Sequence, residues 1–165
     1  WAYGRIGAMG PRAMSALLAL GAYVTVTLVP FTKYPANPPT VGNPDTIDKR
    51  TVLFVTMIAV TILAGVAAAR IRRQLLPRLG GWNAALVAVA AFVVVVGVAQ
   101  LVLPAIHETP RGFPADMLYR FRLASLGINL TLWTTIGLGF GAAAQRLIAP
   151  AAARARVVER SAQSA

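Results

Sequence analysis

"LGGWNAALVAVAAFVVVVGVAQLVLPAI", residues 79–106, decides the fold of this chain, because its 28 residues include no Asp, Glu, Lys, Arg or His. A helix needs about 20 apolar residues to cross the hydrocarbon core of a membrane. Three further windows also lack these residues, with 20 residues at 13–32, 19 at 51–69 and 23 at 123–145. A helix on the surface of a soluble protein would instead carry a charge every third or fourth residue. The sequence therefore predicts an all-α integral membrane protein with four transmembrane helices.

The four windows define one transmembrane helical domain over residues 1–147. We place its spans at about 13–32, 51–69, 82–104 and 123–145, and its longer loops at 33–50 and 105–122. Gly80 and Gly81 follow a run of arginines and mark the turn between the second and third spans. Residues 148–165 form a basic tail. The chain starts without Met and without a signal-peptide pattern, and we expect residues 1–12 to be a basic cytoplasmic stretch from the middle of a longer protein.

The charges predict how these spans are oriented. The chain has 16 basic residues, five acids and a formal net charge of +11. The side of the termini carries ten arginines and one acid, whereas the loops at 33–50 and 105–122 carry six basic residues and four acids. Basic residues concentrate on the cytoplasmic side, so both termini are expected in the cytoplasm and in contact with anionic membrane lipid. Because the positive charge follows the topology, nucleic-acid binding is not expected.

The acidic side chains raise the question of metal binding. Four of the five acids and the only histidine lie in the two longer loops. Carboxylates at a membrane surface concentrate cations, and a mixed nitrogen and oxygen donor set suits Co²⁺, Ni²⁺, Zn²⁺ or Mn²⁺. The candidate donors are Asp45, Asp48, His107, Glu108 and Asp116. No cysteine is present, so thiolate ligands and disulfides are excluded.

The same acids also have a structural interpretation. In "NPDTIDKR", residues 43–50, Asp45 fits the N-cap of a helix and Asp48 fits its first turn, where negative charge favours the helix dipole. Asp116 follows Pro114 at a second helix start and precedes Arg120 by four residues, a spacing that allows an ion pair. Both interpretations of the acids remain open.

The predicted spans themselves carry no ionisable residue, although ion transporters usually bury one. Their polar residues are expected to bond one helix to another, and they are Gln100, Asn129, Thr131, Thr134 and Thr135. Gly137 and Gly141 have the spacing of a close helix-packing face. The sequence has no catalytic triad, nucleotide-binding loop or HExxH motif, so we expect neither an enzyme nor a bound cofactor.

Two stretches, "VPFTKYPANPPTVGNPDTIDKRT" (residues 29–51) and "GFPADMLYRFRLASLG" (residues 112–127), resemble the predicted cobalt transporter subunit CbtA family. The resemblance covers roughly residues 1–147. In the first stretch it carries over to Lys33, Tyr34, Pro35, Asn37, Pro38, Pro39, Asp45, Thr46 and Arg50. In the second it carries over to Gly112, Phe113, Pro114, Asp116, Arg120 and Arg122. His107 is outside the pattern, and the resemblance assigns no metal ligands.

The resemblance implies a bacterial inner-membrane protein that transports Co²⁺ together with other membrane subunits, among them a small single-span partner, CbtB. Two functions follow. The chain is a subunit of a divalent metal cation uptake system, with cobalt as the cation, or it is a non-catalytic accessory subunit of a larger bacterial membrane complex. Carboxylates that converge would favour the first function. Carboxylates that each face Lys or Arg would favour the second.

Overall fold

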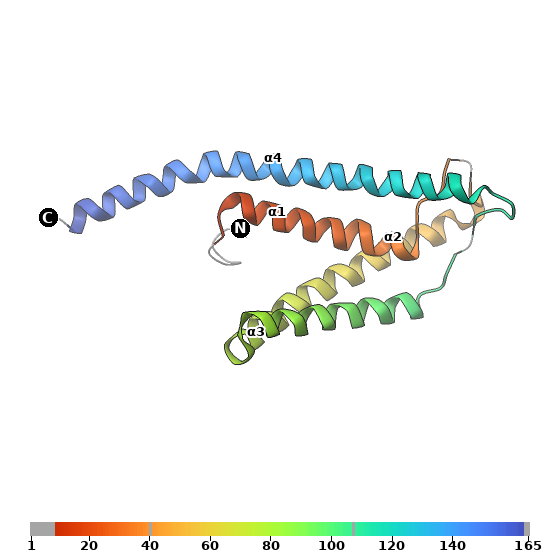
Figure 1. Ribbon diagram of the computed structural model, residues 1–165, viewed down its shortest axis with the longest axis horizontal. Coiled ribbons are helices and arrows are strands. Elements are labelled where there is room, and N and C mark those ends of the chain that lie inside the picture. Colours follow the sequence, from red (N-terminus) through yellow and green to blue (C-terminus); the bar gives the residue numbers. More distant parts are fainter. Residues whose placement is uncertain (1–8, 40, 107, 164–165) are drawn as a thin grey trace. The chain divides into compact units, whose positions relative to one another are not determined.

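The computed structural model describes residues 9–39, 41–106 and 108–163, and every regular element in this part of the chain is helical (Figure 1). The elements are α1 (Pro11–Ala22), the π-helical η1 (Tyr23–Leu28), α2 (Val29–Lys33), the 3-10 helix η2 (Pro44–Thr46), α3 (Ile47–Val102) and α4 (Ala115–Gln163). The chain divides into two compact units. Unit 1 contains Trp1–Tyr23 and Asn129–Ala165, and unit 2 contains Val24–Ile128.

Three helical stretches are long and apolar enough to cross a membrane. They are Pro11–Lys33 with 23 residues, Pro44–Val102 with 59 and Ala115–Ile148 with 34. Large apolar side chains cover their surfaces. Trp82 is 76% exposed, Leu101 87% and Leu147 78%. Hydrocarbon is the solvent in which such helices are stable, because every backbone polar group is paired within the helix. For the described residues, the prediction of an all-helical chain with helices long and apolar enough to cross a membrane is confirmed.

The helical stretch Pro11–Lys33 contains a wider, π-helical turn, which the proline at position 30 explains. Pro11 occupies the first turn of α1, where a backbone N–H would have no partner within the helix, so its absence costs no hydrogen bond. Pro30 lies inside the helical stretch, and in a regular α-helix its ring would clash with the carbonyl four residues earlier. The π-helical turn Tyr23–Leu28 directly precedes α2 and moves that carbonyl away. α2 ends at Lys33, and Tyr34 leaves the helical conformation with φ −125° and ψ 70°, because that conformation is disfavoured for the residue before Pro35.

α3 is a hairpin of two limbs rather than one straight rod. Gly80 has φ 71° and ψ 172°, and the chain reverses direction there (Figure 1). We call residues 47–79 the first limb and residues 81–102 the second limb. Their lengths are about 50 Å and 33 Å at 1.5 Å per residue. The predicted turn over 70–81 is largely helical instead, because arginine, glutamine and leucine are good helix formers and continue the first limb to Leu79.

The core of unit 2 lies where the helix that contains Pro30 packs on the first limb. Met57 and Thr61 are fully buried there. The Thr61 hydroxyl donates to the carbonyl oxygen of Thr25 at 2.7 Å and so joins the two helices. A Cβ added at Gly65 would meet the Thr25 side chain at 3.7 Å, which is ordinary contact. Small and polar side chains thus allow a close approach, as expected for helices packed in a membrane.

Unit 1 is held together by close contact between α1 and α4. The Ser15 hydroxyl donates to the carbonyl oxygen of Gly137 at 2.7 Å and is buried. A Cβ added at Gly137 would lie 2.6 Å from the Cβ of Ala19, and one added at Gly141 would lie 3.2 Å from the Cα of Arg12. Gly137 and Gly141, which the sequence predicts at a helix-packing face, therefore lie at this contact; a side chain at Gly137 would force the helices apart, and one at Gly141 would be tighter than ordinary van der Waals contact.

Candidate functional site

The candidate site lies at the end of unit 2 where two loops meet. The first loop runs over residues 34–43 and the second over residues 103–114, so both are shorter than the sequence predicts. The Tyr34 side chain is buried, and its hydroxyl donates to the carbonyl oxygen of Pro104 at 2.9 Å. Burial raises the pKa of Tyr34, so the phenol keeps its proton at neutral pH and remains a donor. Tyr34 therefore ties the first loop to the second.

Lys33 and Gln100 add a second connection beside Tyr34. The Lys33 ammonium donates to the carbonyl oxygen of Gln100 at 2.5 Å. This carbonyl belongs to the last turn of α3, where acceptors have no partner within the helix and a positive charge is favourable. The Gln100 amide donates in turn to the Thr32 hydroxyl at 2.7 Å. Gln100 thus bonds one helix to another, as the sequence predicts for a polar residue inside an apolar window.

We call the end of unit 2 where the two loops meet the loop end. Glu108 is the most buried of the acids there. Its side chain is only 5% exposed, and its Oε2 lies 2.7 Å from Nη1 of Arg50. The Thr46 hydroxyl donates to its other carboxylate oxygen. The hydrogen bond from Thr46, and then the hydrogen bond and charge of Arg50, hold the pKa of Glu108 below its usual range, although burial opposes them. Glu108 is therefore ionised at neutral pH and joins the second loop to the start of α3.

Gly42 brings the first loop against the same carboxylate. Its φ of +142° is rare for residues that have a side chain. A Cβ at this position would lie 3.2 Å from Oε2 of Glu108, which is tighter than ordinary van der Waals contact. Glycine is needed here both for the backbone conformation and for the close approach.

The remaining acids lie at helix starts. Asp116 is in the first turn of α4 and pairs with Arg120 at 2.9 Å, with side chains that are 73% and 78% exposed. This is the pairing that the sequence predicts. The predicted N-cap at Asp45 is wrong. The helix starts with a 3-10 turn at Pro44, so the Asn43 side chain is the cap and accepts from the backbone N–H of Asp45 at 3.0 Å.

The structure does not gather the proposed metal donors into one cluster. Among the described residues, no group of three or more His, Cys, Asp or Glu side chains could share a metal ion. Asp45 and Asp48 are exposed at the start of η2 and of α3, whereas Glu108 and Asp116 each face an arginine. His107 lies outside the described residues. The arginine pairs are the arrangement expected of structural acids.

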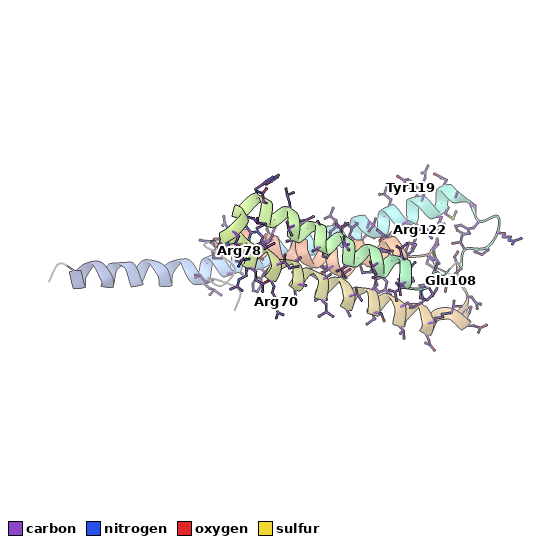
Figure 2. The ribbon with its side chains drawn as sticks, turned by 90° about the horizontal axis from the view of Figure 1, so that it is seen from below. Arg70, Arg78, Glu108, Tyr119 and Arg122 are labelled. Atoms are coloured by element: carbon purple, nitrogen blue, oxygen red, sulfur yellow. The ribbon has the colours of Figure 1, made fainter. Side chains whose placement is uncertain are left out.

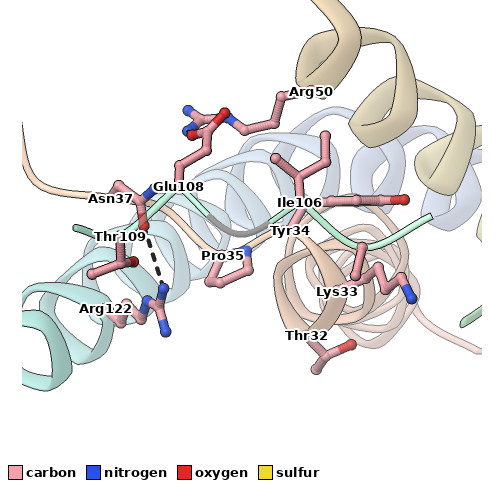
Figure 3. Close-up of a pocket in the computed structure, with 11 residues that line it drawn as sticks. Thr32, Lys33, Tyr34, Pro35, Asn37, Arg50, Ile106, Glu108, Thr109 and Arg122 are labelled. Atoms are coloured by element: carbon pink, nitrogen blue, oxygen red, sulfur yellow. Dashed lines mark hydrogen bonds and ion pairs between the residues drawn. The ribbon is translucent and has the colours of Figure 1, made fainter. Parts of the chain in front are cut away.

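The structure does bring several motif residues together around a cavity. This cavity has a volume of about 360 Å³ and lies between the two loops and the start of α4 (Figure 3). Its polar lining includes Thr32, Lys33, Asn37, Arg50, Glu108 and Arg122. Nε of Arg122 donates to the carbonyl oxygen of Ala36 at 3.4 Å, and Nη2 donates to the Asn37 side-chain oxygen at 3.3 Å. Among the described residues that line it, three are basic and one is acidic.

Other motif residues shape the loops. Gly112 has φ +86°, and the N–H of Phe113 donates to the carbonyl oxygen of Pro110 at 3.2 Å, which closes a tight turn before α4. Pro38 accepts a bond at 3.0 Å from the N–H of Val41 and closes a turn in the first loop. The partner of Glu108 was not predictable from the sequence, because Arg50 is 58 positions away along the chain. The contact forms because the fold places the second loop beside the start of α3.

The comparison with protein families agrees with the helices and with these motifs. A family model described as the probable cobalt transporter subunit (CbtA) matches residues 1–145. No curated protein and no solved structure matches the chain. The matched region includes both loops, the residues around the cavity and the apolar part of every helix. The chain therefore belongs to the CbtA family of probable cobalt transporter subunits.

Proposed function

We propose that this chain is the membrane subunit of a divalent-cation uptake system that imports Co²⁺ across the bacterial inner membrane. The family match over residues 1–145 is the observation that carries the proposal. The long apolar helices agree with it, because they supply the membrane domain that a transporter subunit needs. We further propose that the chain works with other membrane subunits, including a small CbtB-like protein with one span.

We also propose a topology of four spans with both termini in the cytoplasm. Each limb of α3 is long enough to cross the hydrocarbon core by itself, and the reversal at Gly80 separates the two crossings. In unit 2, Arg70 and Arg78 lie toward the turn of α3, and Glu108 and Arg122 lie at the loop end (Figure 2). The arginine-rich turn fits the cytoplasmic side, and the loop end fits the outer side.

In this proposal the acids at the loop end attract the cation before it enters the membrane domain. Asp45 and Asp48 are best suited to this role, because both are exposed and neither has a hydrogen bond or ion pair from its side chain among the described contacts. Glu108 would have to leave Arg50 before it could bind a metal. We therefore propose that further donors, from His107 or from another subunit, complete the coordination of the ion.

The pairing of Glu108 and Asp116 with arginines favours a second candidate function. An accessory subunit would need rigid loops that dock on a partner, and braced carboxylates of this kind provide rigidity rather than metal coordination. In that case no ion would cross the membrane through this chain.

Metal accumulation in cells distinguishes the two functions. Cells that express the full-length gene together with its partner are compared with cells that lack both, and their contents of cobalt, nickel, zinc and manganese are measured by mass spectrometry. Transport predicts cobalt accumulation that depends on the protein and falls in the double variant Asp45→Asn, Asp48→Asn. Asp116→Asn is the matched control, because it removes an acid that already faces Arg120. Unchanged content of all four metals, with well-expressed protein, would favour the accessory function.

A further inference from the structure

The cavity at the loop end has the wrong charge for a divalent cation. Lys33, Arg50 and Arg122 line it, and Glu108 is the acid among its described lining residues. The Glu108 carboxylate is already shared between Thr46 and Arg50, and its side chain is only 5% exposed. Among the described lining residues, the positive charges of Lys33, which is hydrogen-bonded to the Gln100 carbonyl oxygen, and of Arg122 are therefore left without an acidic partner. A field of this sign repels a metal cation and attracts an anion.

Arg122 has more N–H donors than its two hydrogen bonds use. A guanidinium group carries five N–H donors in a fixed fork, and this fork matches the oxygen atoms of carboxylates and phosphates. The contacts of Arg122 with Ala36 and Asn37 are long, at 3.4 and 3.3 Å, and both acceptors are uncharged. Charge-assisted bonds to an oxyanion are typically shorter, at about 2.7–2.9 Å, and roughly twice as strong. An incoming oxyanion would therefore give Arg122 better bonds than it has in this structure.

The walls of the cavity also suit a bound molecule. Its volume of about 360 Å³ lies in the range of small-ligand sites, roughly 300–1,000 Å³. Pro35 and Ile106 supply apolar surface, and Figure 3 shows Arg122 on one side of Pro35 and Lys33 on the other. The connections through Tyr34 and Glu108 hold both loops in place, so the site is largely formed before any ligand arrives.

We propose that this cavity binds an anionic ligand whose phosphate or carboxylate group is held by Arg122, with Lys33 adding positive charge. The ligand comes either from solution, as a free phosphate or a carboxylate, or from the membrane, as the headgroup of a phospholipid. This inference goes beyond metal uptake and holds whichever cation the complex carries.

The test uses the full-length protein in nanodiscs of a zwitterionic lipid, titrated with inorganic phosphate and with citrate in a calorimeter. A second arm exchanges the protein into nanodiscs that contain phosphatidylglycerol and measures the retained lipid by native mass spectrometry. Arg122→Gln and Lys33→Gln each remove one of the two charges that have no acidic partner among the described lining residues. Arg111→Gln is the matched control, because Arg111 is exposed in the second loop and does not line the cavity. Size-exclusion profiles and thermal unfolding establish that each variant is folded.

We expect saturable binding of phosphate or citrate that Arg122→Gln weakens at least about tenfold and that Arg111→Gln leaves unchanged, which would assign a soluble ligand. Binding only in the lipid arm, with the same dependence on Arg122, would assign a headgroup. Arg122→Lys should retain part of the affinity, because it keeps the charge and loses the fork. The proposal is overturned by absence of binding in both arms, or by equal binding to the Arg122→Gln and Arg111→Gln proteins.

Discussion

Replacing Gly137 by alanine should loosen the packing of α1 on α4. The added Cβ would lie 2.6 Å from the Cβ of Ala19, whereas two carbon atoms are best separated by about 3.5–4.0 Å. The Ala19 Cβ is bonded directly to the backbone and cannot rotate away. The two helices must therefore separate locally by about 1 Å to remove the overlap.

The expected change in the free energy of unfolding combines three contributions. Overpacking of a well-packed site typically destabilises a protein by about 1–3 kcal/mol. The separation also stretches the 2.7 Å bond from Ser15 to the Gly137 carbonyl oxygen, which is worth about 0.5–1.5 kcal/mol. Alanine is a better helix former than glycine, and this offsets up to about 1 kcal/mol. We expect a net loss of about 1–3 kcal/mol in the free energy of unfolding.

Gly139→Ala is the matched control, because a Cβ at Gly139 meets nothing within 4 Å and the residue lies in the same helix. Both variants are purified in a mild detergent, and their unfolding is followed by circular dichroism as sodium dodecyl sulfate is added. Gly137→Ala should unfold at a clearly lower fraction of sodium dodecyl sulfate, and Gly139→Ala should be at least as stable as the unsubstituted protein. Equal stability of the two variants would refute the reasoning about the contact of α1 with α4.

Three further predictions concern unit 2. Glu108→Gln should lower the free energy of unfolding by about 1–3 kcal/mol, because Arg50 and Thr46 lose a charged partner. The pKa of Glu108 in the folded protein is depressed. Its contribution to the free energy of unfolding should therefore be present above the ordinary glutamate pKa of about 4.3 and be lost as the pH falls through the folded-state pKa. A melting temperature that depends on pH in the same way in the Glu108→Gln variant would contradict this. Gly80→Ala should cost about 1–3 kcal/mol in the same unfolding assay, because its φ of 71° and ψ of 172° define a conformation that is almost confined to glycine, whereas Gly81→Ala should be neutral or slightly stabilising. These 165 residues contain no cysteine, so Arg111→Cys and Arg78→Cys each add one thiol whose labelling is compared with that of the unsubstituted protein. An impermeant maleimide should label the first added thiol in intact cells and not the second, and the reverse result would invert the proposed topology.

The helical membrane domain was predictable because apolar windows without charge leave few other folds available. The same applies to the reversal at Gly80 and to the pair Asp116–Arg120, since both depend on neighbouring residues. Helix ends were less predictable. The basic run after residue 69 continues as helix, and Asn43 rather than Asp45 caps the next element, because local propensity and a proline decide those positions.

The loop end was not predictable in the same way. Glu108 meets Arg50, Tyr34 meets Pro104 and Arg122 meets Asn37 only because the fold brings the two loops and the starts of α3 and α4 together, although they are far apart in the sequence. Hydropathy and spacing carry no information on such pairs. The sequence therefore left a cation site and a structural role both open for the acids, whereas the structure places Glu108 against Arg50 beside a cavity whose described lining has more basic than acidic residues.

Uptake of radioactive cobalt into right-side-out membrane vesicles tests the central claim most directly. The vesicles come from cells with the full-length protein and its partner and from cells without them, and nickel and manganese are added as competitors. The account predicts saturable cobalt uptake that requires the protein. Cobalt uptake equal to that of vesicles without the protein, when the protein is correctly inserted, would contradict the account.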